Sequence, residues 1–196
     1  LVRGGGNYCI GAAGVHITLS GSQTGVSYQL YRNGIFTVGG PVSGTGSPLD
    51  FGLQTLVGTY TVVATNTITG CVNNMAGGVA VAIIPLPTAY TITGGGGYCV
   101  GGAGSIVGLS GSDAGVDYQL FNGVTPIGAP VPGTGAAISF GPQTLAGAYT
   151  VVATDASTTC VNNMSGFVVV TINLLPNTFS VTGGGIYCED GAGVSI

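Results

Sequence analysis

Hydrophobic and polar residues alternate along several short segments of the chain. In residues 15–19 and again in residues 26–30, every second side chain is apolar. A period of two places the apolar side chains on one face, which is typical of a half-buried β-strand. Residues 59–65 and 79–84 are further β-branched runs, and Gly or Pro clusters separate them. No long window has helical periodicity, so the pattern predicts an all-β protein.

Two Asn-Gly pairs follow expected strands, one after residues 26–30 and one after the similar segment at residues 116–120. Asn33-Gly34 and Asn122-Gly123 stand where a tight connection between neighbouring strands is needed. Asn and Gly tolerate the positive φ angles of a type I′ turn. Both pairs are therefore predicted to form two-residue hairpin loops.

The chain repeats itself. The period is 90 residues up to Arg32 and 89 beyond it, because Arg32 has no counterpart in the second copy. We expect an immunoglobulin-like repeat at residues 1–87 with an incomplete N-terminal strand, a second at 88–176 and the start of a third at 177–196. The pattern is expected to belong to a longer array. The matching segments are Gly-Gly-Gly-x-Tyr-Cys, Tyr-Gln-Leu-Tyr or Phe, Gly-Thr-Gly, Gln-Thr-Leu, Tyr-Thr-Val-Val-Ala-Thr and Cys-Val-Asn-Asn-Met.

Strand number and repeat length together predict the fold class. About seven short strands in a repeat of this size are typical of an immunoglobulin-like β-sandwich. Tyr60 and Tyr149 each follow Gly-Thr or Gly-Ala at the start of a late strand, which matches the tyrosine corner of such folds. Prolines at residues 85–87 and 175–176 predict short, semi-rigid linkers between repeats. We place strand A of the second repeat at residues 89–93.

Charge is scarce in this sequence. It has two basic residues and six acidic ones, and charged residues make up only 4% of the chain. A chain without a basic face cannot neutralise a phosphate backbone, which argues against nucleic acid as a partner. No apolar run has the length of a membrane helix, so no membrane insertion is expected here. A neutral surface suits a protein that is anchored or assembled outside the cell.

The five cysteines occupy two positions of the repeat. They are Cys9, Cys99 and Cys188 before the second strand, and Cys71 and Cys160 between the last two strands. Their regular recurrence indicates disulfides and an oxidising compartment. Zinc is a weaker interpretation because the chain has one His and no CxxC motif.

Two disulfide pairings are open at this point. Cys9 with Cys71 and Cys99 with Cys160 would close a bond inside each repeat. In a sandwich of this class, however, the A–B loop of one domain faces the F–G loop of the next. Cys9 could therefore bond with Cys160 across the junction instead.

No catalytic, cofactor or metal site is predicted. His16 is the only imidazole, and its counterpart in the second copy is Ile106. We expect His16 to point to solvent, without a Ser-His-Asp arrangement. The acidic residues do not recur between copies either, as a calcium site of the repeat would require. An isolated site near Asp113 and Asp117 is the alternative to solvated surface acids.

The repeat resembles the immunoglobulin-like modules of large secreted surface proteins of Bacteroidetes-type bacteria. The resemblance rests on the repeated segments quoted above and covers essentially the whole chain. It implies stalks, adhesins or surface filaments, and no enzyme activity in the module itself.

Two functions follow as hypotheses. The first is a structural extracellular repeat protein that forms a rod, surface filament or adhesin stalk and self-assembles into a homo-filament, with neighbouring repeats as its partners. The alternative is a carbohydrate-binding or adhesive module for surface glycans. Such sites use exposed aromatic rings, and Tyr31 and Phe121, which face away from the predicted core, are the candidates.

Overall fold

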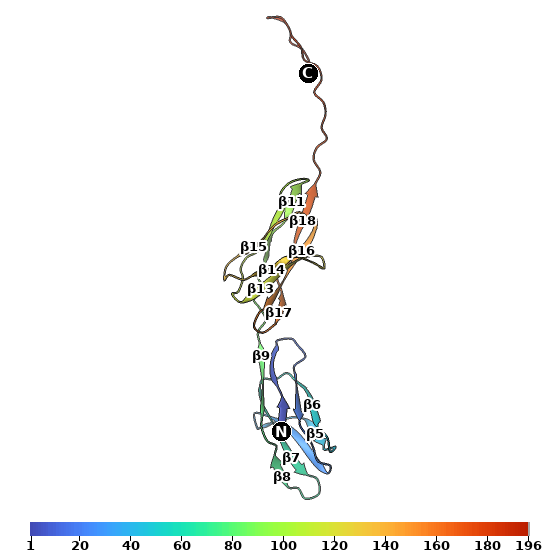
Figure 1. The fold of residues 1–196 in the computed structure, drawn as a ribbon, viewed down its shortest axis with the longest axis vertical. Helices are drawn as coiled ribbons and strands as arrows, with labels where there is room; N and C mark the ends of the chain where they lie inside the picture. The colour runs from blue at the N-terminus through green and yellow to red at the C-terminus, as the bar shows by residue number, and fades with distance from the viewer. Residues whose placement is uncertain (196) are drawn as a thin grey trace.

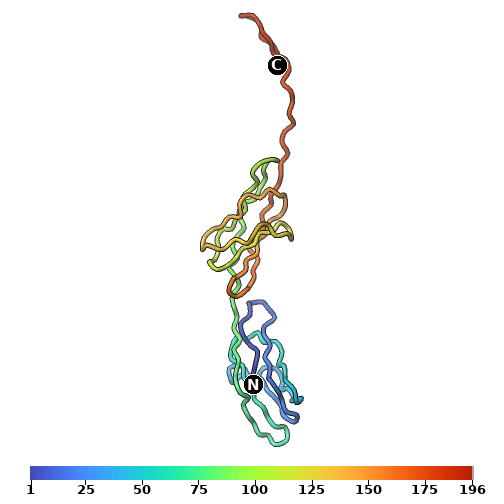
Figure 2. Tube along the Cα trace, in the orientation of Figure 1, coloured from blue at the N-terminus to red at the C-terminus, as the bar shows by residue number. Residues whose placement is uncertain are grey.

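The computed structural model describes residues 1–195. Ile196, which belongs to the expected start of a third repeat, lies outside the described residues. Two all-β sandwiches follow one another along the long axis of the molecule (Figure 1). Residues 174–195 contain no strand and extend away from the second sandwich, which the tube in Figure 2 makes clear.

The first sandwich consists of a three-stranded and a six-stranded sheet. The small sheet has the order β1-β3-β6, and the large one has the order β2-β9-β7-β4-β5 with β8 paired to β7. Its strands are β1 Val2–Gly4, β2 Gly6–Cys9, β3 Val15–Leu19, β4 Val26–Arg32, β5 Phe36–Ser43, β6 Leu49–Gln54, β7 Gly58–Asn66, β8 Val72–Asn74 and β9 Val79–Ile84.

The second sandwich has the same two sheets. Their orders are β10-β12-β15 and β11-β18-β16-β13-β14, with β17 paired to β16. The strands are β10 Ile92–Gly94, β11 Gly96–Cys99, β12 Ser105–Leu109, β13 Val116–Asn122, β14 Thr125–Pro132, β15 Ile138–Gln143, β16 Gly147–Asp155, β17 Val161–Asn163 and β18 Val168–Asn173. Both sandwiches have the immunoglobulin-like arrangement predicted from the sequence.

The glycine run at the start of each repeat carries the first strand from one sheet to the other. β1 pairs antiparallel with β3, whereas β2 pairs parallel with β9 in the opposite sheet. Gly5 lies between the two strands with φ +68°, and a Cβ there would stand 2.6 Å from the Ala80 carbonyl oxygen. Only glycine permits this close crossing. β10 pairs with β12 in the same way, so residues 92–94 belong to the second sandwich.

The apolar positions of the alternating pattern form one core in each sandwich. Ile17, Leu19 and Leu30 are fully buried in the first. Nine core positions are shared by the two copies: Val2/Ile92, Ile17/Val107, Leu19/Leu109, Tyr28/Tyr118, Leu30/Leu120, Tyr60/Tyr149, Val62/Val151, Ala64/Ala153 and Val81/Val170. Burial of these side chains supplies most of the driving force for folding.

Tyr60 and Tyr149 anchor the loop before their own strands. The Tyr60 hydroxyl donates to the Leu56 carbonyl at 2.8 Å, and the Tyr149 hydroxyl donates to the Leu145 carbonyl at 2.7 Å. Both rings are buried, and burial raises the pKa of both hydroxyls.

The two hairpins after β4 and β13 differ from the predicted two-residue Asn-Gly turns. Arg32 pairs with Phe36, so the first loop has three residues, of which Asn33 and Gly34 have positive φ. Asn122 is instead the last strand residue, and the second loop is Gly123-Val124 with positive φ at Gly123 alone. The prediction of two type I′ turns was therefore wrong. The additional residue of the first copy lengthens the loop, while the strand pairs that flank it, Arg32–Phe36 and Asn122–Thr125, are equivalent.

Candidate functional site

A disulfide joins the two sandwiches. Cys9 ends β2 in the first repeat, and Cys160 precedes β17 in the second. Their Cα atoms are 5.6 Å apart although 151 positions separate them in the sequence. This decides between the two pairings left open by the sequence, in favour of the bond across the junction. Within residues 1–195 the thiols of Cys71, Cys99 and Cys188 are free and exposed.

The linker between the sandwiches is held by the second repeat. The Asn162 side-chain amide donates to the Pro87 carbonyl at 2.8 Å. Asp113 accepts two hydrogen bonds, from the Thr88 backbone NH at 3.1 Å and from the Tyr90 hydroxyl at 2.7 Å. Residues 87–90 are therefore fixed to the sandwich that follows them, and Pro87 itself is buried.

The Tyr90 ring lies directly over Gly111. A Cβ at Gly111 would stand 2.4 Å from a ring carbon of Tyr90, so no larger residue is accommodated without moving the ring. The Tyr90 carbonyl accepts from the Ser165 NH at 2.8 Å, and its NH lies 3.4 Å from the Met164 sulfur. These contacts cover Met164, which is 5% exposed.

Asp113 has a structural role that the sequence did not reveal. Its hydrogen bond from Tyr90 is the main reason that the Asp113 pKa is lowered, with the contacts to Thr88 acting in the same direction. The first copy has Gln23 at this position, so repetition gave no signal for it. Asn162 was missed for a different reason, since its counterpart Asn73 is identical and sequence gives no sign of which one has a partner.

Side chains that could ligate a metal are scattered in the described part of the chain. No group of three or more His, Cys, Asp or Glu side chains in residues 1–195 lies close enough to hold a metal ion. Nor do these residues include a helix long and apolar enough to cross a membrane.

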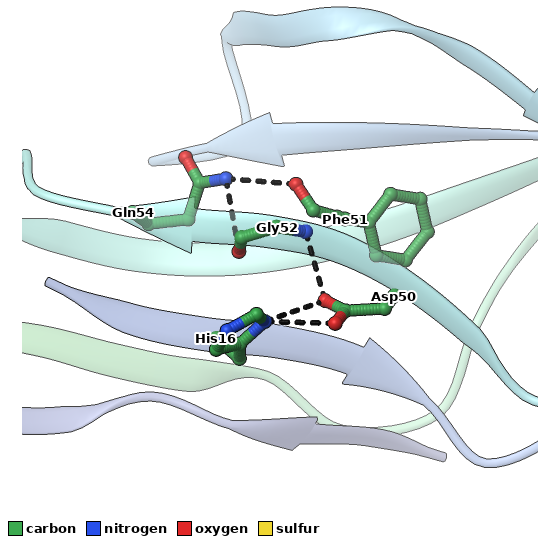
Figure 3. A network of polar contacts seen from close by, with 5 residues as sticks. All are labelled: His16, Asp50, Phe51, Gly52 and Gln54. Atoms are coloured by element: carbon green, nitrogen blue, oxygen red, sulfur yellow. Dashed lines mark hydrogen bonds and ion pairs between the residues drawn. The ribbon is translucent and has the colours of Figure 1, made fainter. Parts of the chain in front are cut away.

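His16 lies on the exposed surface of the small sheet and contacts Asp50 (Figure 3). Its Nδ1 is 2.7 Å from one Asp50 oxygen and 3.0 Å from the other. The Gly52 NH also donates to Asp50 at 2.8 Å, and these two hydrogen bonds lower the pKa of this carboxyl. Both side chains are about half exposed. The second copy has Ile106 and Ser139 here, so the pair is a feature of one repeat.

The bulge beside this pair recurs in both repeats. The Gln54 side-chain amide donates to the Phe51 carbonyl at 3.0 Å (Figure 3), and Gln143 donates to Phe140 at the same distance. Gly52 has φ +78° and provides the irregular backbone. The arrangement is a structural bend of the strand. The hydrogen-bond partner of the His16 imidazole in the described residues is the Asp50 carboxylate.

Tyr31 and Phe121 are both half-buried. Tyr31 lies on the outer face of the large sheet at the edge of an open hollow of about 390 Å³. The other residues around this hollow are Gly34, Thr61, Val63, Asn74 and Met75. This hollow therefore combines an aromatic ring with polar and apolar neighbours on the outer face of the sheet.

Comparisons with known proteins give a likeness of fold only. No protein-family model matches the chain, and no curated protein matches it. Among solved structures, fibronectin(III)-like modules of Clostridium thermocellum CbhA align with 93% of this chain and 100% of theirs, at 14% identity and a TM-score of 0.40. Murine CEACAM1b aligns with 85% of this chain and 96% of its own, at 12% identity and a TM-score of 0.37. The immunoglobulin-like assignment of the two sandwiches rests on the chain's own sheet topology.

Proposed function

We propose that this protein is an extracellular structural repeat protein whose immunoglobulin-like units, at residues 1–87, 88–176 and from 177 onward, form a stiff rod or surface filament. The observation that carries the proposal is the covalent bond between Cys9 and Cys160. A disulfide across a junction fixes neighbouring units to each other, which is of use to a rod and of little use to independent binding domains.

The linker supports the same function. Asn162 and Asp113 hold residues 87–90 against the second repeat, while the disulfide provides a second connection between the sandwiches. Two separate connections oppose bending at the junction more strongly than a proline linker alone. Because disulfides persist in oxidising environments, this construction also favours a location outside the cell.

The scarcity of charge is compatible with lateral or end-to-end association. With a formal net charge of −4 on 196 residues, little repulsion opposes contact between copies. Self-assembly into a homo-filament is therefore part of the proposal, with neighbouring repeats as the first partners.

Small-angle X-ray scattering tests the stiffness of the junction. The oxidised protein should scatter as two sandwiches in line, with one maximum dimension that is unchanged by temperature well below unfolding. Cys9→Ser should broaden the distance distribution because the junction can then bend at the linker. Identical distributions for both proteins would refute the proposed role of the disulfide.

Cryo-electron microscopy of the native protein, isolated without reducing agent, tests the assembly itself. Filaments with a beaded repeat of one sandwich are expected. Short dispersed particles would argue against a filament.

A glycan-binding role is the second candidate, and the hollow beside Tyr31 is the observation that favours it. A ring next to Asn74 offers a stacking surface and an amide for a sugar hydroxyl. A glycan array should then give hits that Tyr31→Ala abolishes. Background signal throughout would remove this candidate.

A further inference from the structure

The bond across the junction has a direction. It runs from the end of β2 in the first repeat to the turn before β17 in the second. We name these parts the opening hairpin, at residues 5–16, 95–106 and 184–195, and the closing turn, at residues 66–71 and 155–160. Each opening hairpin and each closing turn contains one cysteine.

All three opening hairpins have the same backbone hydrogen bonds. The first closes each hairpin at its base: Gly5 to His16, Gly95 to Ile106 and Gly184 to Ser195, at 2.8–2.9 Å. The second bends the chain after each cysteine, and its acceptors are the carbonyls of Cys9, Cys99 and Cys188 at 2.8–3.0 Å. Cys99 is therefore held in the same local geometry as the bonded Cys9, yet its thiol is free and exposed.

The two closing turns are also alike. Asn66 and Asp155 each receive a backbone hydrogen bond from the residue before the cysteine and donate one to the cysteine carbonyl, all at 2.9 Å. The residue before each cysteine, Gly70 or Thr159, has φ of +70° or +61°. The two cysteines differ in burial, since Cys160 is 0% exposed and Cys71 is exposed.

The first repeat has a hollow beside Cys71. The equivalent surface of the second repeat is the one that the linker covers. The hollow has a volume of about 190 Å³, and its lining includes Gln23, Asn73 and Met75. The counterparts of these three residues, Asp113, Asn162 and Met164, are the ones that contact residues 87–90. In the first repeat the same surface is open, and Met75 is only half-buried.

We propose that the Cys9–Cys160 bond is one instance of a link that recurs along the array. Cys99 and Cys71 each provide one cysteine of a further link of this kind. Cys99 bonds to the closing-turn cysteine of a following repeat, and Cys71 bonds to the opening-hairpin cysteine of a preceding repeat. The linker of that preceding repeat lies in the hollow lined by Gln23, Asn73 and Met75. The inference rests on the proposed function as a linear array, and it names the partner as another repeat of the same class.

The chemistry of the link is thiol–disulfide exchange with a small disulfide such as oxidised glutathione. One protein thiolate attacks this disulfide, forms a mixed disulfide and releases one reduced thiol. The second protein thiolate then attacks the mixed disulfide and releases the other. Two protein thiols are oxidised to one cystine, and one small disulfide is reduced to two thiols.

Disulfide mapping of the native protein tests the proposal. The unreduced protein is alkylated to block free thiols, digested with chymotrypsin and analysed by mass spectrometry. The Cys99 peptide should be linked to a peptide from a Cys-x-Asn-x-Met segment. The Cys71 peptide should be linked to a peptide that begins at the cysteine of a Gly-Gly-Gly-x-Tyr-Cys segment, because chymotrypsin cleaves after the tyrosine. Alkylated Cys71 or Cys99 in most molecules, or a Cys71–Cys71 link, would overturn the proposal.

The sequence of the linked peptide identifies the source of the partner repeat. A Cys99 peptide joined to the Cys71 peptide shows a second copy of residues 1–196. A partner peptide with a different sequence of the same class shows a further repeat. Both results support the link, and imaging for filaments then tests the array separately, since the bond can exist without filaments.

A selectivity measurement on the recombinant chain supplies an independent test. In a Cys188→Ser background, concentrated protein is oxidised with glutathione disulfide, and the three links Cys71–Cys99, Cys71–Cys71 and Cys99–Cys99 are quantified. Random pairing yields the mixed link in twofold excess over each symmetric one. At least tenfold excess is expected, and a twofold ratio would overturn the proposal. Cys71→Ser and Cys99→Ser in the same background are the matched controls, since each lacks one half of the link.

Discussion

Cys9 and Cys160 are bonded to each other although most of both sandwiches lies between them in the sequence, at a separation of 151 residues. A force applied to the two ends of the chain therefore passes from Cys9 directly to Cys160. The residues between them, which include most of both cores and the linker, are outside this covalent path.

Single-molecule force spectroscopy should show this bypass. Pulled between its ends, the oxidised protein should extend without releasing the residues enclosed by the bond. Cys9→Ser should release them and add about 500 Å of contour length, at roughly 3.3–3.6 Å per residue over the sequence separation of 151. Equal contour lengths for the two proteins would contradict the disulfide. Cys71→Ser leaves the bond intact and is the control.

Replacement of Gly111 should disturb the linker contact. Gly111→Ala places a methyl group against the Tyr90 ring, and overpacking of this kind typically costs about 1–3 kcal/mol. The free energy of unfolding of the second repeat, measured in urea, should fall by that amount. Gly21 is the equivalent residue of the first repeat and has open space around it. Gly21→Ala should therefore change stability by less than about 0.5 kcal/mol, and equal effects of the two substitutions would refute the role of Tyr90.

Removal of the Tyr149 hydroxyl should weaken the second sandwich. The ring is fully buried and its hydroxyl is bonded to the Leu145 carbonyl. Tyr149→Phe keeps the ring but leaves that carbonyl without its partner, with an expected loss of about 1 kcal/mol in the free energy of unfolding. Chemical denaturation measures it. Tyr31→Phe serves as the control because the Tyr31 ring is only half-buried. A loss as large in the control would show that the hydrogen bond is not the cause.

Asp155 should make the second closing turn sensitive to acid. Hydrogen bonds from Ser157 and Thr158 lower its pKa to about 2. Because the folded pKa lies below the unfolded value of about 3.9, its stabilising effect is complete above pH 4 and is lost as the pH falls through 2. An NMR titration of the carboxyl carbon should give a midpoint near 2, and a midpoint near 4 would contradict these bonds.

The first repeat provides the matched variant for this experiment. Asn66 stands at the position of Asp155 and accepts the equivalent two backbone hydrogen bonds at 2.9–3.0 Å, without a titrating group. Asp155→Asn should therefore keep the turn and remove its acid sensitivity. Persistent sensitivity of the turn in this variant would assign the effect to another group.

Much of the fold could be predicted because its signals are local. The alternation in residues 15–19 and 26–30 depends only on which side chains face the core, and both segments are strands. The hairpin prediction failed at Asn122 for the opposite reason, since the place of a turn depends on the register of two strands. Arg32 takes the strand position that Asn122 has in the second copy, so the one additional residue lengthens the first loop and places Asn33 in it.

The contacts of the linker could not be predicted. Asp113 and Asn162 are ordinary polar residues in the sequence, and their partners Tyr90 and Pro87 are 23 or more positions away. Only the packing of the second sandwich against the linker that precedes it brings them together. The hydrogen bond between His16 and Asp50 is a similar case, since it joins two strands 34 positions apart.

The sequence by itself determined the strands, the repeat, the sandwich class and the two positions of cysteine in each repeat. It could not determine which cysteines join, because every copy has the same local geometry around its cysteines and a bond within a repeat satisfies the pattern as well as a bond between repeats. Disulfide formation requires two Cα atoms within a few ångströms of each other. The tertiary structure decided the pairing, since the end-to-end stacking of the sandwiches brings Cys9 next to Cys160.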